Sequence, residues 1–362
     1  MVFVRTRAVS LLLACALSSC ASEPPPEDRR VSQEDRARAA EGARIVGDLL
    51  EEQDLDRAAE VSDQVMEQDP FSPESNLAAA RARAAVAVRD QDPRLYQEAV
   101  RRADFACEAD PLDPKAFFVR GKLQFDRQYY TRAAIDFERV IELDPSHHDA
   151  LLMKAWAHRA LRQPKAEKAA WHALVEAHPE DAQANYRLAL ILMEGTPEEV
   201  TEGEQLLARA AELDPRDDLV LHELARLKSG ADEHAEAEAL LRRALEAAAG
   251  KPGREADLLF NLGAAVQAQG RHEEARDLYE RCLEIRHDHA RALGNLGLVL
   301  LELGQQKEAI RRLRQARDLE PSRKVRASIE KLLEDLKSAE SSEPGEPDEE
   351  TDSTTESSDQ SP

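Results

Sequence analysis

The sequence predicts an all-α protein made of consecutive helical hairpins, preceded by a signal sequence and followed by an acidic segment. Three observations support this prediction. Alanine, leucine, glutamate and arginine dominate the 362 residues, and only 4% are aromatic, a composition that favours helices over strands. Prolines recur at a spacing of 34 residues, at Pro111, Pro145 and Pro179. The first residues combine basic side chains with a short apolar run.

The charge balance excludes some classes of partner. The formal net charge is -23. A protein this acidic is repelled by phosphate backbones, so nucleic acid is excluded as a partner. We also expect no small-molecule substrate. The repeat described below implies partners that are proteins or peptides.

Residues 1–19 are predicted to be a signal peptide. Arg5 and Arg7 precede an apolar run of about ten residues, which suits a signal sequence and is too short for a bilayer span of roughly twenty. The run ends in Leu17-Ser18-Ser19-Cys20, which resembles the lipobox of bacterial lipoproteins. The resemblance implies cleavage between Ser19 and Cys20 and a covalent lipid on Cys20. The alternative is an ordinary secretory signal that contains a cysteine.

The lipid would hold the chain in the cell envelope. Two or three acyl chains give stable membrane anchoring. By resemblance to lipoproteins of known sorting, Ala21 favours the outer membrane over the inner one, with the body on the periplasmic side. Residues 20–33 contain Pro24, Pro25 and Pro26, and consecutive prolines favour an extended, semi-rigid spacer. We expect this segment to be the tether between the lipid and the folded body.

A repeat of about 34 residues accounts for most of the remaining chain. Each repeat is predicted to form two helices that pack against each other. Each helix carries one small residue that allows close approach, and a large apolar residue one turn after the second small residue packs between the helices. The first-helix small residues are Gly121, Ala155, Ala189, Ala225, Gly263 and Gly297. The second-helix small residues are Ala133, Gly203, Ala237, Ala275 and Ala309, with Glu167 as the exception. The large residues are Phe137, Trp171, Leu207, Leu241, Tyr279 and Leu313.

This pattern resembles the tetratricopeptide repeat, whose consensus has small residues at these two positions and a proline at the end. The resemblance implies a right-handed α-solenoid of about eight hairpins over residues 34–321. Two earlier repeats are placed through Ile45, Leu49 and Ala58, and through Leu77, Ala80 and Ala99. The second of these is longer than 34 residues, and we expect the excess in an extended loop near Gln91-Asp92-Pro93.

The chain is predicted to end in a capping helix and a tail. Residues 322–338 place apolar side chains on one helical face, which would cover the last repeat. These are Val325, Ile329, Leu332, Leu333 and Leu336. Residues 339–362 contain nine acidic residues and no basic ones. Such a segment buries too little apolar area to offset its ordering entropy, so we expect a disordered acidic tail.

No catalytic motif is found, and we expect neither an enzyme nor a cofactor beyond the covalent lipid on Cys20. The sequences after His222 and His272 begin like a zinc-protease helix but lack its second histidine. The histidines around His147 and His289 are interpreted as solvated turn residues rather than metal ligands. Cys107 and Cys282 lie in distant repeats and should not form a disulfide. Cys282 is interpreted as a small packing residue.

The resemblance also implies a binding groove along the first helices of the hairpins, at fixed offsets from the small residue. The groove candidates are Phe118, Lys122, Phe125, Leu152, Trp156, Arg159, Tyr186, Leu190, Met193 and Phe260. The same offsets give Ala264, Gln267, Gly294, Leu298 and Leu301 in the last two repeats. Aromatic residues exposed in a concave surface are typical of binding sites. We predict a partner site centred on Phe118, Trp156 and Tyr186. The alternative is that neighbouring helices bury these rings.

The leading functional hypothesis is a membrane-anchored scaffold or adaptor in the bacterial cell envelope. The architecture resembles that of pilotins, which act in secretin and pilus assembly. One alternative is a non-catalytic subunit of an envelope enzyme complex in cell-wall or outer-membrane biogenesis. Another is a structural periplasmic spacer. Architecture alone does not choose among these.

Overall fold

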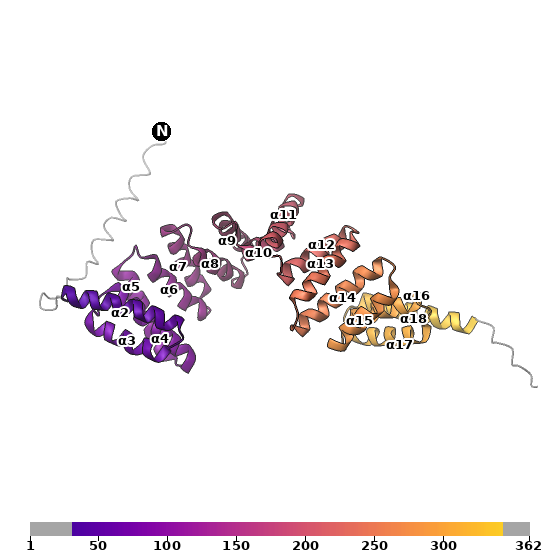
Figure 1. Cartoon of the computed structure of the whole chain (residues 1–362), viewed down its shortest axis with the longest axis horizontal. Helices are drawn as coiled ribbons and strands as arrows, with labels where there is room; N and C mark the ends of the chain where they lie inside the picture. The colour runs from indigo at the N-terminus through magenta and orange to yellow at the C-terminus, as the bar shows by residue number, and fades with distance from the viewer. Residues whose placement is uncertain (1–30, 343–362) are drawn as a thin grey trace, which may run out of the picture. The chain divides into compact units, whose positions relative to one another are not determined.

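The computed structural model describes residues 31–342, which form seventeen α-helices and no β-strand (Figure 1). The helices belong to two compact units, one ending at His178 and one beginning at Pro179. The helices of the first unit are α2 (Gln33–Glu51), α3 (Leu55–Gln68), α4 (Pro73–Asp90), α5 (Pro93–Ala109), α6 (Pro114–Asp126), α7 (Tyr130–Leu143), α8 (His148–Ala160) and α9 (Pro164–Ala177).

The second unit has the same hairpin organisation and one additional helix. Its helices are α10 (Ala182–Leu192), α11 (Pro197–Leu213), α12 (Asp218–Gly230), α13 (His234–Ala247), α14 (Pro252–Ala268), α15 (His272–Ile285), α16 (Ala290–Glu302), α17 (Gln306–Leu319) and α18 (Arg323–Ser342). In the described part of the chain, the helices α2 to α17 pair in sequence order into eight hairpins. The predicted all-α fold of repeated hairpins is therefore confirmed.

Several sequence predictions lie outside the described residues. They concern the signal peptide, the cleavage site at Ser19 and Cys20, the proline-rich part of the tether, and most of the acidic tail. Within the described residues, no helix is long and apolar enough to cross a membrane.

Aspartates define the ends of many helices. Asp110 and Asp144 follow α5 and α7, and each carboxylate accepts a backbone N–H two residues later, from Leu112 and from Ser146. The next helix then begins with a cap, as at α6, where Asp113 accepts the N–H of Lys115. These side chains satisfy backbone groups that a helix leaves unpaired at its ends. The Asp-Pro recurrence in the sequence therefore marks the turn between one hairpin and the next.

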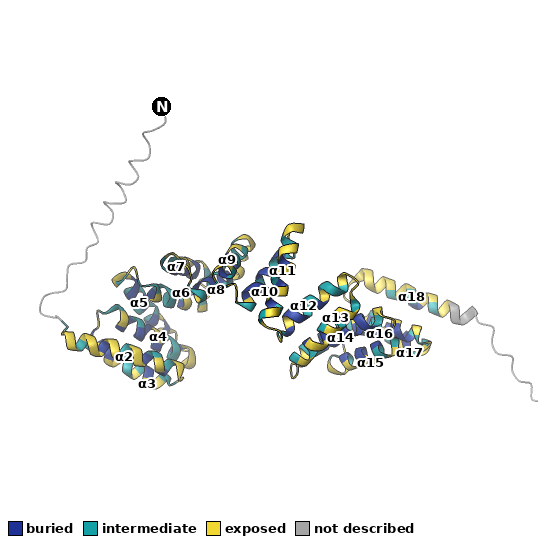
Figure 2. Cartoon of the chain, turned by 45° about the horizontal axis from the view of Figure 1, so that its top comes forward, coloured by how far each residue is buried: buried dark blue, intermediate teal, exposed yellow. Residues whose placement is uncertain are grey.

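The core of each hairpin follows the predicted small-to-large packing. A Cβ added to Gly121 would lie 2.8 Å from Phe137 Cε1, and one added to Gly263 would lie 2.7 Å from Tyr279 Cε1. Only glycine therefore allows the first helix to approach the ring at these two positions. The six predicted large residues are all at most 1% exposed. Figure 2 shows the buried residues on the facing sides of the paired helices.

One prediction about the first repeats is wrong. The connection between α4 and α5 is only Gln91 and Asp92, with Gln91 in the left-handed region at φ 54°. The excess residues extend the two helices instead, because the alanine-rich sequence before Gln91 favours helix. Of the residues through which the first repeat was placed, Leu49 and Ala58 are buried and Ile45 is 39% exposed. Ile45 lies on α2, the first helix of the described residues.

The capping helix also differs from the prediction. Val325 is 45% exposed, because α18 packs onto α17 only through its later turns. There, Leu333 is buried against Ile310 and Leu313. The helix continues to Ser342, four residues into the segment predicted to be disordered. Ala339 and Glu340 are strong helix formers, and the first proline follows only at Pro344.

Candidate functional site

A hollow with a volume of about 970 Å³ lies in the first unit. We call it the N-terminal hollow. First helices α4 and α6 supply most of its lining, and residues of the turn between α2 and α3 also line it. Its apolar lining includes Leu77, Val88, Phe118 and Val119. Val88 is 65% exposed, so the hollow presents apolar surface to the solvent.

Phe118 and Lys122 are the predicted groove residues that line the N-terminal hollow. The Phe118 ring is half-buried and packs between two other rings. Its centroid lies 5.9 Å from that of Phe137 on α7 and 5.0 Å from that of His147. The ring is therefore held by its own hairpin and the next turn, with one part facing the hollow. Lys122 is exposed.

A second hollow of about 460 Å³ adjoins α6 and α8. It is lined by Phe125, Trp156 and Arg159, which the sequence placed in the groove, and by Met153. Trp156 is half-buried, and its ring meets that of Trp171 edge-on, with centroids 5.5 Å apart. The Arg159 guanidinium lies 5.3 Å from the centroid of the Trp156 ring. Leu152, one turn before Trp156, is half-buried but does not line this hollow.

The predicted exposure of Tyr186 is wrong. Tyr186 belongs to the second unit and is only 6% exposed. It packs in the core against Ala189 and Leu207, and Leu190 and Met193 are half-buried against the same cluster. The same cluster contains Val220 of α12, the first helix of the next hairpin. For Tyr186 the alternative therefore holds, in which neighbouring helices bury the ring, and this residue contributes no exposed ring to the predicted site.

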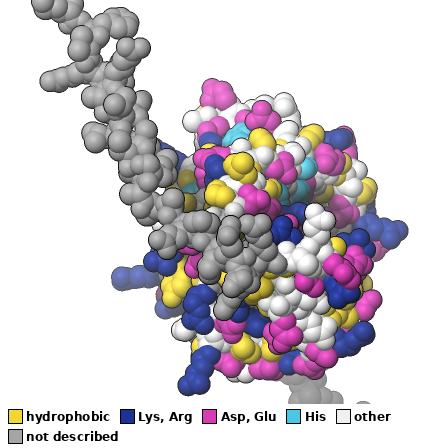
Figure 3. Space-filling view, turned by 90° about the vertical axis from the view of Figure 1, so that its left-hand side faces the viewer, with side chains coloured by type: hydrophobic (Ala, Val, Ile, Leu, Met, Phe, Trp, Pro, Cys, Tyr) yellow, Lys and Arg dark blue, Asp and Glu magenta, His cyan; other side chains and the backbone are white. Residues whose placement is uncertain are grey.

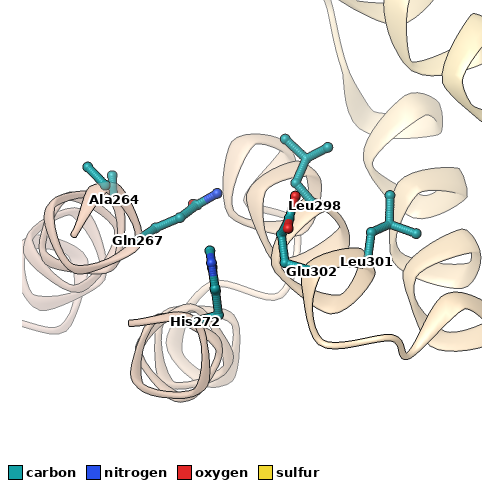
Figure 4. Close-up of a pocket in the computed structure, with 7 residues that line it drawn as sticks. Ala264, Gln267, His272, Leu298, Leu301 and Glu302 are labelled. Carbon is teal, nitrogen blue, oxygen red and sulfur yellow. The ribbon is translucent and has the colours of Figure 1, made fainter. Parts of the chain in front are cut away.

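The second unit has a hollow of about 430 Å³ between α14 and α16 (Figure 4). Ala264, Gln267, Leu298 and Leu301 line it, at the offsets that the sequence gave for the last two repeats. Figure 4 shows the side chains of Gln267 and His272 pointing toward each other. The Tyr279 hydroxyl donates to Gln267 Oε1 over 2.7 Å, so the amide of Gln267 is held in place.

Phe260 repeats the arrangement found at Phe118. Its centroid lies 6.1 Å from the Tyr279 ring and 4.8 Å from the His289 ring. The interpretation of His289 and His147 as solvated turn residues is wrong. Each caps the following helix, with Nδ1 accepting a backbone N–H, from Ala292 over 3.1 Å and from Ala150 over 3.3 Å. These contacts hold both imidazoles beside a phenylalanine ring.

The His289 cap predicts a pH dependence of stability. Burial lowers the pKa of His289 below its ordinary value, and Arg286 and Arg291 lower it further. Because the fold favours the neutral imidazole, the contribution of His289 to the free energy of unfolding is complete above the pKa that histidine has in the unfolded chain, about 6.5. It is lost as the pH falls through the folded pKa. We expect His289→Asn, which keeps a cap acceptor without titrating in this range, to lose less unfolding free energy between about pH 7.5 and 5.5.

Urea unfolding at both pH values measures this difference. The matched control is His287→Asn, because His287 is exposed in the same turn. An equal loss of stability in the native chain and the His289→Asn variant would show that His289 does not titrate with unfolding.

The described residues contain few groups suited to covalent chemistry. Burial raises the pKa of Cys107 to about 12 and that of Cys282 to about 11, so both thiols stay protonated near neutral pH. Both are free, in agreement with the prediction that they form no disulfide. Cys282 is fully buried, as expected for a packing residue. No group of three or more metal-ligating side chains occurs in residues 31–342.

Sequence reasoning missed several lining residues of the N-terminal hollow. Leu77, Arg81 and Ala84 on α4 all line it. They lie three before, one after and four after Ala80, which are the offsets used for the other repeats. Extending those offsets to the second repeat finds all three. Lys115 also lines the hollow, but it lies in the first turn of α6, outside the offsets, and no sequence signal marks it.

Comparison with known proteins identifies the repeat. Tetratricopeptide repeat models match residues 92–148 and 152–218, and residues 216–287 and 254–320, so that together they cover more than half of the chain. No curated protein matches the sequence.

Three solved structures illustrate the proteins to which this chain is similar. PilF of Pseudomonas aeruginosa is 17% identical, covers 60% of this chain and 97% of its own, and has a TM-score of 0.49. A chain of the APC/C hetero-tetramer Cut9–Hcn1 is 16% identical, with 77% of this chain and 52% of that chain covered and a TM-score of 0.47. The present chain thus spans about half of that one. MamA of Desulfovibrio magneticus RS-1 is 25% identical. The match covers 47% of this chain and 94% of that chain, and its TM-score is 0.38.

Proposed function

Because the chain belongs to the tetratricopeptide repeat family, we propose that it is a lipid-anchored scaffold that binds an envelope protein through the N-terminal hollow. The observation that carries the proposal is the apolar surface of this hollow, which is open to solvent at Val88. Solvent-facing apolar surface inside a concave site is typical of protein- and peptide-binding surfaces.

The proposed anchor rests on the sequence around Cys20. A basic start, a short apolar run and a lipobox-like segment occur together in the first twenty residues. We propose that the mature chain begins at Cys20 and carries the lipid there. The folded body would then face the periplasm, on the outer membrane in preference to the inner one.

The proposed action is binding without catalysis, and no cofactor is proposed beyond the lipid. The buried cysteines and the engaged imidazoles are consistent with structural roles. His222, for example, is hydrogen-bonded to Asn261 over 2.8 Å. We propose neither nucleic acid nor a small molecule as a partner, since the net charge is -23 and the hollows are broad and open.

Val88→Glu tests the proposed site in living cells. Val88 is so exposed that the substitution should leave the fold intact while placing a charge in the hollow. A bound apolar group would then face a desolvated carboxylate, so we expect capture of the partner to fall at least about tenfold. The measurement is crosslinking in cells, membrane solubilisation and quantitative mass spectrometry of proteins recovered with the tagged chain.

Ile135→Glu is the matched control. Ile135 is 64% exposed on α7 and does not line the N-terminal hollow. The proposal requires capture to survive in this variant and to be lost with Val88→Glu. If the partner is captured equally well by both variants, the binding site lies outside the N-terminal hollow.

The captured protein also decides between the narrower forms of the function. A secretin or pilus-assembly protein would indicate a pilotin-like role. An enzyme of cell-wall or outer-membrane biogenesis would indicate a non-catalytic subunit. A native chain that recovers no specific protein would indicate a structural spacer and contradict the scaffold proposal.

A further inference from the structure

Two cationic side chains lie where the N-terminal hollow joins a neighbouring one. The neighbour has a volume of about 610 Å³ and lies along α2, α4 and the first turn of α6; we call it the edge hollow. Leu77, Arg81 and Lys115 line both hollows. Arg81 extends from α4 toward α2, where a Cβ added to Gly47 would lie 3.7 Å from its Nη1 atom. The junction is therefore bounded by an arginine and a lysine.

Arg81 and Lys115 have no ion-pair partner among the residues that the structure describes, whereas most of the surrounding charges are engaged. Three ion pairs lie around the junction: Asp56–Arg89 at 2.8 Å, Asp54–Arg57 at 3.6 Å and Arg44–Glu41 at 3.5 Å. The carboxylates of Glu74, Asp110 and Asp113 accept hydrogen bonds from Ser72 Oγ and from the N–H groups of Leu112 and Lys115. Arg81 and Lys115 are thus cations at the junction that can meet an incoming anion.

Apolar surface lies on both sides of the junction. In the N-terminal hollow it comes from Val88 and Val119, and in the edge hollow from Ala40, Ala43 and Leu112. Leu112 is 69% exposed. Figure 3, which faces the α2–α5 end of the first unit, shows apolar side chains interspersed with charged ones on this face. A complementary ligand therefore has an acidic centre and apolar residues on either side of it.

We propose that the junction binds a glutamate or aspartate of an amphipathic partner segment, whose apolar residues occupy the two hollows. The proposal rests on the proposed binding function of the N-terminal hollow and specifies its ligand. An arginine and a lysine each form charge-assisted hydrogen bonds with a carboxylate, and these bonds are stronger than neutral ones. Because the whole chain carries a charge of -23, a strongly acidic ligand is repelled at long range. The favoured segment carries only a few acidic residues, placed between apolar ones.

The acidic C-terminal segment of the chain itself is a poorer ligand. Residues 339–362 supply nine acidic side chains, but their apolar residues are only Ala339 and three prolines. Such a segment can pair with Arg81 and Lys115, but it has too few apolar side chains to cover the apolar surfaces of the two hollows.

The test uses the full chain in detergent micelles and three labelled synthetic peptides. Each peptide is about 14 residues long, about four helical turns. Each has leucines toward both ends and blocked termini, so that no terminal carboxylate contributes. The two central residues are Glu-Glu, Gln-Gln or Lys-Lys. Fluorescence anisotropy should give a Kd for the Glu-Glu peptide about five- to tenfold lower than for Gln-Gln, with Lys-Lys weakest.

The junction variant is Arg81→Gln/Lys115→Gln, which should bind the Glu-Glu and Gln-Gln peptides equally. Arg101→Gln/Arg132→Gln is the matched control, since it removes two exposed cations of the same unit that line neither hollow. This control should keep the preference for Glu-Glu.

Three results would overturn the proposal: no measurable binding of the Glu-Glu peptide, equal affinity for Glu-Glu and Gln-Gln in the native chain, or a preference that survives in the junction variant. Binding that occurs only after residues 339–362 are deleted would also overturn it, because the chain's own tail would then be the occupant. None of these results depends on partner capture in cells, which tests the proposed function separately through Val88→Glu.

Discussion

Trp171→Ala should lower the free energy of unfolding of the first unit by about 3–5 kcal/mol, the range for a buried tryptophan replaced by alanine. Trp171 is 0% exposed and is the largest of the fully buried side chains in the described residues. It occupies the large position of the α8–α9 hairpin, where Glu167 replaces the usual small residue. Its ring also contacts that of Trp156, which lines the second hollow, so its loss removes a contact that holds Trp156 as well as core packing.

Urea unfolding followed by far-UV circular dichroism measures this loss. Trp171→Phe is the informative second variant, because phenylalanine retains most of the apolar volume. The indole Nε1 of Trp171 has no hydrogen-bond partner in the described residues, so no hydrogen bond is lost with it. We expect Trp171→Phe to cost clearly less than Trp171→Ala. If both variants cost under about 0.5 kcal/mol, as surface substitutions do, the packing argument for this hairpin would be wrong.

Cys20→Ser should release the chain from membranes almost completely. A thioether-linked diacylglycerol and an amide-linked acyl chain together give stable anchoring, whereas a single chain is marginal. Serine has no thiol to alkylate, and the apolar run before it is too short to span a bilayer. Cell fractionation after a carbonate wash and metabolic labelling with palmitate measure the two consequences, release from the pellet and loss of label.

Cys15→Ser is the matched control for the anchor. It also removes a cysteine from the signal region, but not the one in the lipobox-like segment. We expect this variant to stay membrane-bound and labelled. A Cys20→Ser chain that remains in the washed membrane fraction would contradict the lipoprotein proposal, although the binding function of the folded body would be unaffected.

Sequence pattern predicted the hairpins because their packing rule is local. A small residue on one helix and a large apolar residue on its partner recur at a fixed spacing, and Gly121 with Phe137 and Gly263 with Tyr279 meet as that spacing requires. The fixed spacing did not correctly predict the connection between α4 and α5. Sequence length showed that residues were added there, but helix propensity and the Gln91 cap placed them in the helices rather than in a loop.

The candidate site was predicted less completely than the fold. Offsets from the small residues located Phe118, Lys122 and Trp156, which line hollows of the first unit. They also selected Tyr186, whose ring is buried in a cluster with Leu207 of its own hairpin and Val220 of the next one. Whether a ring is buried or faces a groove depends on the side chains that surround it in both hairpins, and a fixed offset from one small residue carries no information about them.

By itself, the sequence determined the helical hairpin repeat and the prolines that follow the second helix of several hairpins, because these follow from contacts within one or two turns and one hairpin. It also carries the lipobox-like segment on which the proposed anchor rests. Only the tertiary structure decided where the hollows lie, that His147 and His289 are caps, and that Arg81 and Lys115 lie at one junction with no ion pair to the residues that the structure describes. These features join residues of different hairpins, and their geometry depends on how neighbouring helices pack, which the repeat pattern leaves open.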